Sequence, residues 1–274
     1  MTDAFSRIVT RFFDLLVIPF GDDRSLALAG LSLACGVVMI FLFKATSNQT
    51  AIRRTRDQFK ARILEMRLYQ DDVVLILKAL GGALASNGSY LRVSLKPILV
   101  LLLFVLVVFI QLDERYGRGP FAPGDRTVLT VTLKDGADVN VVPVSLVPKA
   151  GVAVDSEPVR VGARREINWR LRVDSIGMHD VQVTAYDKTY AFPVTAEANN
   201  RGIGHSRTAN STIQSLIHPT LPPLRKDSPI QSVSLTYPES SYSLFGWHTH
   251  WLVVFIICSF VGALIPKFLF GIEV

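Results

Sequence analysis

A lysine, Lys44, lies where a long apolar segment ends and a polar one begins. Residues 26–43 carry no charge, and Ser47, Asn48 and Gln49 follow Lys44 closely. A charge inside a membrane costs several kcal/mol unless it meets water or a partner. Lys44 therefore has two possible roles. It is a solvated charge in a water-filled groove, whose polar lining the next residues extend, or its long stem carries the ammonium to the lipid headgroups.

A strongly basic segment follows this junction, with cations at Arg53, Arg54, Arg56 and Lys60. One interpretation is a surface that captures acidic or polar segments. The other is a plain connector, because basic loops are the rule on the cytoplasmic side of membrane proteins. The net charge is +6, but a nucleic-acid function also needs a recognisable binding module. The sequence contains none, so we expect no nucleic-acid partner.

Covalent and metal chemistry find little support in the sequence. There is no Walker loop, no G-x-S-x-G and no H-E-x-x-H pattern. His248 and His250 are two residues apart and lack a third ligand. Cys35 and Cys258 both fall in apolar runs, where a free thiol behaves as a small hydrophobe. We therefore expect no enzyme activity, no catalytic residue, no metal and no cofactor.

Three apolar runs dominate the chain of 274 residues, of which 49% are hydrophobic. A membrane-spanning helix needs roughly 20 mostly apolar residues. The runs, with their flanking residues, predict three transmembrane helices at 23–44, 91–112 and 247–270.

The N-terminus, 1–22, has apolar residues at helical spacing with charges among them. This pattern predicts an amphipathic helix that lies on the membrane surface and ends near Pro19. A signal peptide, which has a different layout, and a frayed tail are the alternatives.

Lys and Arg are in excess in the first loop, and such loops are cytoplasmic. The expected location is the cell inner (plasma) membrane, with the N-terminus outside and the C-terminus in the cytoplasm. Within the loop, 47–69 reads as one helix with an apolar stripe through Ile52, Phe59 and Ile63. A turn at 70–72 and a second striped helix, stopped at Gly81-Gly82 or Asn87-Gly88, complete a cytoplasmic helical hairpin, 45–90.

This layout resembles the YidC/Oxa/Get superfamily of membrane protein insertases. The short three-span members are most similar, such as the archaeal YidC-like proteins and the insertase subunit of the ER membrane complex. The stretch FLFKATSNQTAIRR is similar to the segment in which YidC proteins carry a groove arginine, with Lys44 at the matching place. The resemblance covers roughly residues 5–112 and the last span.

The resemblance implies a fold and a mechanism. Three helices would surround a hydrated groove that is open to the cytosol and contains Lys44. Nascent or client membrane proteins would be the partners, captured by the basic hairpin, and their apolar segments would slide into the lipid bilayer.

The region between the second and third spans departs from the superfamily pattern. Residues 120–197 alternate apolar and polar residues in short runs separated by turn residues, which predicts an extracytoplasmic all-β, Ig-like sandwich with Trp169 in its core. Residues 198–246 are rich in Asn, Ser, Thr, Gly and Pro and predict an extended linker, with one late strand near 232–238. The alternative function is therefore a structural or scaffold subunit whose sandwich binds an outer partner protein.

Overall fold

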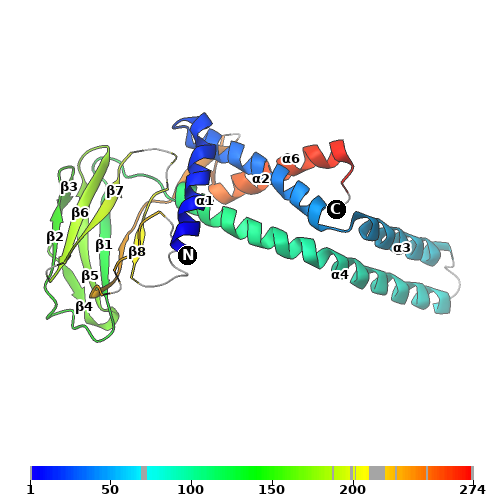
Figure 1. Ribbon diagram of the computed structural model, residues 1–274, viewed down its shortest axis with the longest axis horizontal. Helices are drawn as coiled ribbons and strands as arrows, with labels where there is room; N and C mark the ends of the chain where they lie inside the picture. The colour runs from blue at the N-terminus through cyan, green and yellow to red at the C-terminus, as the bar shows by residue number, and fades with distance from the viewer. Residues whose placement is uncertain are drawn as a thin grey trace. The chain divides into compact units, whose positions relative to one another are not determined.

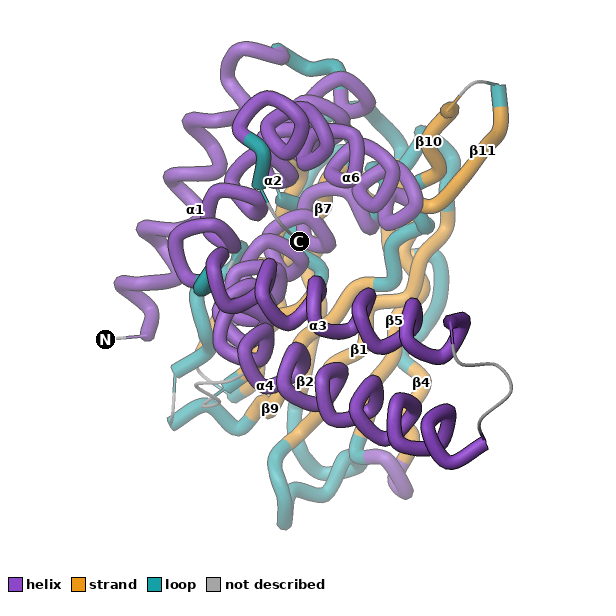
Figure 2. The backbone as a smooth tube through the Cα atoms, turned by 90° about the vertical axis from the view of Figure 1, so that its right-hand side faces the viewer, coloured by secondary structure: helices purple, strands orange, loops and turns teal. Residues whose placement is uncertain are grey.

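The computed structural model describes residues 2–68, 73–186, 188–197, 200, 202–209, 220–225, 227–244 and 246–272. The chain forms two compact units (Figures 1 and 2). One, the sheet unit, contains Met1–Leu28 and Phe109–Val253. The other, the helical unit, contains Ala29–Val108 and Val254–Val274. Each unit is described by itself.

Long helices α2 (Arg24–Thr46), α3 (Gln49–Leu68), α4 (Val73–Leu112) and α6 (Trp251–Phe270) run into or through the helical unit. Three segments are long and apolar enough to cross a membrane, namely Arg24–Thr46, Ser94–Gly117 and Trp251–Phe270. At about 1.5 Å per residue, each matches or exceeds the roughly 30 Å of a bilayer core. The prediction of three apolar helices is confirmed, with shifted bounds.

Helix α4 corrects the predicted hairpin. It continues for 40 residues through Gly81-Gly82, Asn87-Gly88 and Pro97, so the predicted break near 81–88 is wrong. The second apolar segment, Ser94–Gly117, is therefore continuous with the second helix of the hairpin. Each glycine costs only about 1 kcal/mol in a helix, and the leucines and alanines around them favour helix. The predicted turn at 70–72 lies outside the described residues. The hairpin 45–90 thus consists of α3 and the first half of α4.

Helices α2 and α6 pack with their backbones in contact. A Cβ atom built on Gly36 would overlap the Ser259 carbonyl oxygen, and one built on Gly262 would overlap the Leu33 carbonyl oxygen. Only glycine permits such an approach, which is typical of membrane helix pairs. The rings of Phe41 and Phe270, 5.4 Å apart, meet at the far end of the same contact.

The sheet unit contains two larger antiparallel sheets and one two-stranded hairpin. The larger has the order β3-β5-β1-β9-β8, with β4 also paired to β5, and the smaller has the order β2-β6-β7. Their strands are β1 (Arg126–Leu133), β2 (Val144–Pro148), β3 (Val152–Val154), β4 (Val159–Val161), β5 (Glu166–Val173), β6 (Met178–Ala185), β7 (Lys188–Thr195), β8 (Ser206–Thr208) and β9 (Ile230–Leu235). Figure 1 shows the strands β1 to β8 gathered in this unit.

Both sheets contribute to one hydrophobic core. Alternate residues of the strands point inward, and Trp169 is 3% exposed, as the sequence predicted. In the larger sheet Leu129 faces Trp169 on one side and Leu235 on the other. The structure is therefore a β-sandwich whose core includes residues beyond the predicted boundary at 197.

Within the described residues, the prediction for 198–246 is confirmed for its late strand, which is β9, and wrong for the stretches that form β8 and a later hairpin. Strand β9 inserts beside β1, because Ile230, Val233 and Leu235 supply apolar side chains to the core. A hairpin of β10 (Ser241–Leu244) and β11 (Trp247–His250) follows. The last apolar helix consequently begins at Trp251, and not at 247.

The N-terminal segment forms α1 (Thr2–Val17) and the short helix η1 (Ile18–Phe20), with Pro19 inside the latter. A helix over most of 1–22 was predicted. Phe13 and Val17 are buried, whereas Phe12 and Leu15 are exposed. The helix therefore has two apolar faces, of which one packs on the protein.

Candidate functional site

Lys44 lies in the last turn of α2, and its side chain is exposed. Its ammonium lies 5.7 Å from the ring centroid of Phe270, at the end of α6. A cation over an aromatic face is worth about 0.5–1 kcal/mol at an exposed site. The contact holds the charge between the C-terminal ends of two packed apolar helices. Such ends carry partial negative charge, which favours a cation there.

Ser47 and Asn48 form the junction between α2 and α3. The Asn48 side-chain oxygen accepts the Ala51 amide at 3.0 Å, which is the N-cap bond of α3. The Gln49 side-chain amide donates to the Ser47 hydroxyl. Ser47 and Asn48, both predicted groove residues, therefore shape the turn between α2 and α3.

A cavity of about 280 Å³ opens beside this junction. Its lining, which we call the Lys44 cavity, consists of Lys44, Gln49, Thr50, Arg53 and Gly271. Two cations, a hydroxyl and an amide surround the space, so it suits carboxylate or carbonyl oxygens. The structure brings together Lys44 and Gln49 from the predicted groove and Arg53 from the predicted capture surface. Sequence reasoning missed Gly271, because only the packing of α6 on α2 brings it there.

The remaining predicted capture residues extend along α3 away from the cavity. Arg54 and Lys60 are exposed, and Arg56 is half-buried. Phe59, Ile63 and Leu64 are also exposed, at 38%, 44% and 63%. Ile52, the first residue of the predicted apolar stripe, is buried. The exposed side of α3 combines the basic residues with Phe59 and Ile63.

A buried arginine in the sheet unit was not predicted. Arg115 lies just after α4, in the single π-helical turn Asp113–Gly117, and is 1% exposed. Its guanidinium bonds Asp14 at 2.8 Å and donates to the carbonyl oxygens of Thr10 and Asn200 at 3.1 and 3.2 Å. The sequence signal was a charged pair, Glu114-Arg115, directly after a long apolar run.

Neighbouring bonds tie the same turn to other segments. Arg24 donates to the carbonyl oxygens of Arg115 and Arg118 at 2.5 and 2.8 Å. The buried Glu114 carboxylate accepts the Thr220 hydroxyl at 2.8 Å. The start of α2 and the end of α4 are thereby joined within the sheet unit.

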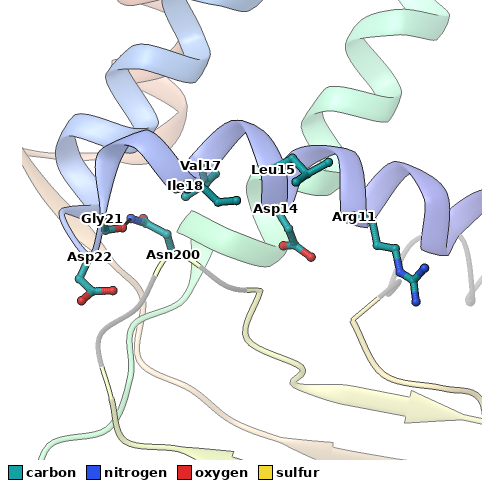
Figure 3. Close-up of a pocket in the computed structure, with 8 residues that line it drawn as sticks. All are labelled: Arg11, Asp14, Leu15, Val17, Ile18, Gly21, Asp22 and Asn200. Atoms are coloured by element: carbon teal, nitrogen blue, oxygen red, sulfur yellow. Dashed lines mark hydrogen bonds between the residues drawn. The ribbon is translucent and has the colours of Figure 1, made fainter.

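A larger cavity of about 640 Å³ lies along α1 and η1 (Figure 3). Its lining, which we call the α1 cavity, consists of Arg11, Asp14, Leu15, Val17, Ile18, Gly21, Asp22 and Asn200. Among the described residues, no three His, Cys, Asp or Glu side chains come together as a metal-ligand set in either cavity or elsewhere.

A scan against protein-family models finds no match for this sequence, and a search of the curated proteins finds none either.

Proposed function

We propose that the chain is a multi-pass inner-membrane protein of insertase type, which guides polar segments of client proteins across the membrane. The observation that carries the proposal is the Lys44 cavity, with two cations at the shared end of a packed pair of apolar helices. A hydrated cationic site at that place would lower the cost of bringing a client's polar or acidic segment into the membrane.

The directions of the apolar helices support a topology of three spans with the N-terminus outside. The C-terminal ends of α2 and α6 meet at Phe41 and Phe270, so these two helices run the same way. Two parallel spans require one further span between them, which the Ser94–Gly117 segment supplies. Both ends carry a lysine in their last turn, Lys44 and Lys267. Lysines at that end favour a cytoplasmic location for it, and an outer location for the N-terminus and the sandwich, which we take to be Ig-like.

The mechanism needs neither covalent chemistry nor a cofactor. Arg54, Arg56 and Lys60 would gather acidic or polar client segments, and the exposed Phe59 and Ile63 would contact apolar ones. The segment would then pass to the Lys44 cavity, where Lys44 and Arg53 neutralise it while its apolar part moves into lipid. Ser47 and Asn48 act by holding the turn.

The test compares two lysines of equal charge at the same helix ends. Full-length protein with Lys44→Gln or Lys267→Gln is reconstituted in liposomes, and insertion of a short client with an acidic translocated tail is measured by protease protection. Lys267 lies outside the cavity lining. We expect Lys44→Gln to lower insertion several-fold and Lys267→Gln to leave it near wild type. Equal effects, or none, would refute a working groove.

A scaffold subunit is the second candidate, and one observation favours it. Strand β2 is an edge of the smaller sheet, and Val147 on it is 54% exposed. An exposed apolar edge strand is a place where another chain can add. A photo-crosslinker at Val147 should then capture one defined protein in cells, whereas an insertase should give client adducts at Phe59.

A further inference from the structure

The α1 cavity combines groups of opposite charge along one helix. Arg11 and Asp14 are one turn apart on α1, and Asp22 follows η1 (Figure 3). One oxygen of Asp14 is held by Arg115 at 2.8 Å. Asp22 and Arg11 are both exposed. The cavity therefore has an acidic end and a basic end, which suits a zwitterion.

Asn200 supplies a fixed acceptor in the cavity lining. Its side-chain amide nitrogen donates to the Gly21 carbonyl oxygen at 2.6 Å, and its backbone carbonyl oxygen accepts from Arg115 at 3.2 Å. Because Gly21 offers an acceptor, the nitrogen must face it, which fixes the place of the side-chain oxygen. Asn200 is 6% exposed, and this oxygen has no hydrogen-bond partner among the described residues. Buried acceptors normally have a donor, and the described residues of the site supply none.

Apolar surface adjoins these polar groups. Leu15 and Ile18 line the cavity and are 65% and 68% exposed. Ile8 and Phe12, on the same side of α1 as Leu15, are exposed as well. The lining ends at Asp22, two residues before α2 begins its apolar course at Arg24. A ligand with a zwitterionic head and long apolar tails matches this arrangement.

We propose that the α1 cavity binds the headgroup of phosphatidylethanolamine. The primary ammonium donates hydrogen bonds to the Asn200 side-chain oxygen and to the carboxylates of Asp14 and Asp22. The phosphate accepts from Arg11, and the acyl chains lie along Leu15 and Ile18. A choline headgroup carries the same charge but has no N–H donor, so it leaves the Asn200 acceptor unmet. The inference rests on the membrane location proposed above and not on client insertion.

The first experiment measures lipid selectivity. Full-length protein in detergent micelles is titrated with phosphatidylethanolamine, its N-methyl and N,N-dimethyl derivatives, and phosphatidylcholine, and bound lipid is counted by native mass spectrometry. We expect affinity to fall along this series and to be about tenfold weaker for choline, since hydrogen bonds to a charged group are lost. Equal affinity across the series would overturn the proposal.

Adjacent aspartates provide a matched control. Asp22 lines the cavity, whereas Asp23 caps α2 by accepting the amides of Ser25 and Leu26. Asp22→Asn and Arg11→Gln should each reduce phosphatidylethanolamine binding towards the choline level. Asp23→Asn, which removes the same charge but keeps a capping oxygen, should bind like wild type. Equal loss in Asp22→Asn and Asp23→Asn would mean non-specific attraction and overturn the assignment.

Two further measurements distinguish a lipid from a soluble ligand, and lipid binding from client insertion. Water-soluble glycerophosphoethanolamine should not displace the lipid at equal concentration, because it lacks the chains that contact Leu15 and Ile18. If it does displace the lipid, the ligand is a soluble one and the lipid assignment is wrong. Lys44→Gln should bind phosphatidylethanolamine like wild type, so a failed insertion test leaves this measurement intact.

Discussion

Replacing Gly36 with alanine is expected to push α2 and α6 apart. The new Cβ atom would overlap the Ser259 carbonyl oxygen and lie 2.8 Å from the carbonyl carbon, where an ordinary contact needs at least 3.4 Å. The carbon contact alone requires the backbones to separate by about 0.6 Å, and the oxygen overlap requires more. A gap of about 0.5–1 Å forfeits a quarter to a half of the dispersion energy between facing atoms. Overpacking of this kind costs about 1–3 kcal/mol.

The control is a glycine with open space around it, and the reporter is the native thiol of Cys35. Gly81 lies in α4 with nothing within 4 Å of an added Cβ, so Gly81→Ala should stabilise the protein by up to about 1 kcal/mol through helix propensity. Unfolding is followed in mixed micelles of mild detergent and dodecyl sulfate. Maleimide labelling of Cys35, which is 8% exposed and adjacent to Gly36, reports the opening of the contact.

Gly262→Ala provides the internal check. The same separation of the helices relieves both overlaps, so the double variant should lose less than the sum of the two single losses. Gly81→Ala should unfold at or above the wild-type midpoint in dodecyl sulfate. If Gly36→Ala does the same, and Cys35 is labelled at the wild-type rate, then α2 and α6 do not meet at Gly36.

Three further predictions concern single contacts. Arg115→Met should loosen α1 and cost about 3 kcal/mol, the low end for a broken buried pair because Asp14 is 48% exposed, and hydrogen exchange should rise in α1 before the sandwich. Asn48→Ala should cost about 1 kcal/mol and speed exchange in the first turn of α3, whereas Asn48→Asp keeps the cap and should not. Burial raises the pKa of Tyr237 above its usual 10.0, so its contribution to stability is present below pH 10 and is lost as the pH rises through the raised pKa. Tyr237→Phe should reduce the loss of stability between pH 8 and 11 in denaturant titrations, because Tyr242, whose pKa burial also raises, still contributes. It should cost about 1–3 kcal/mol because the buried Thr195 amide loses its acceptor.

The parts of the fold that local sequence determines were predictable. Apolar length alone indicates the three long helices, and alternation places Trp169 in a core. Strand β9 was also visible as a late alternating run. The polar composition of its neighbours in 198–246 predicts a linker, because short strands there gain stability from the sandwich and not from their own residues.

The contacts that define the two cavities could not be predicted, since they join distant residues. Arg115 meets Asp14 and Asn200 only after α1 has packed beside the end of α4. Gly271 reaches the Lys44 cavity only because Gly36 and Gly262 let α6 approach α2. The break expected in α4 failed for another reason. Helix formation is cooperative, so three glycines (Gly81, Gly82 and Gly88) inside a long run of good helix formers do not end it.

The unbroken helix α4 has a mechanical consequence. Its 21 residues from 73 to 93 precede the apolar Ser94–Gly117 segment and extend about 30 Å at 1.5 Å per residue. In the membrane topology proposed above, the length of this helix sets how far from the bilayer α3 ends and α4 begins its return. The unbroken helix also fixes the rotational orientation of its tip. One inserted residue would advance the tip by about 1.5 Å and turn it by about 100°, so the arm would present a different side to anything that approaches from the water.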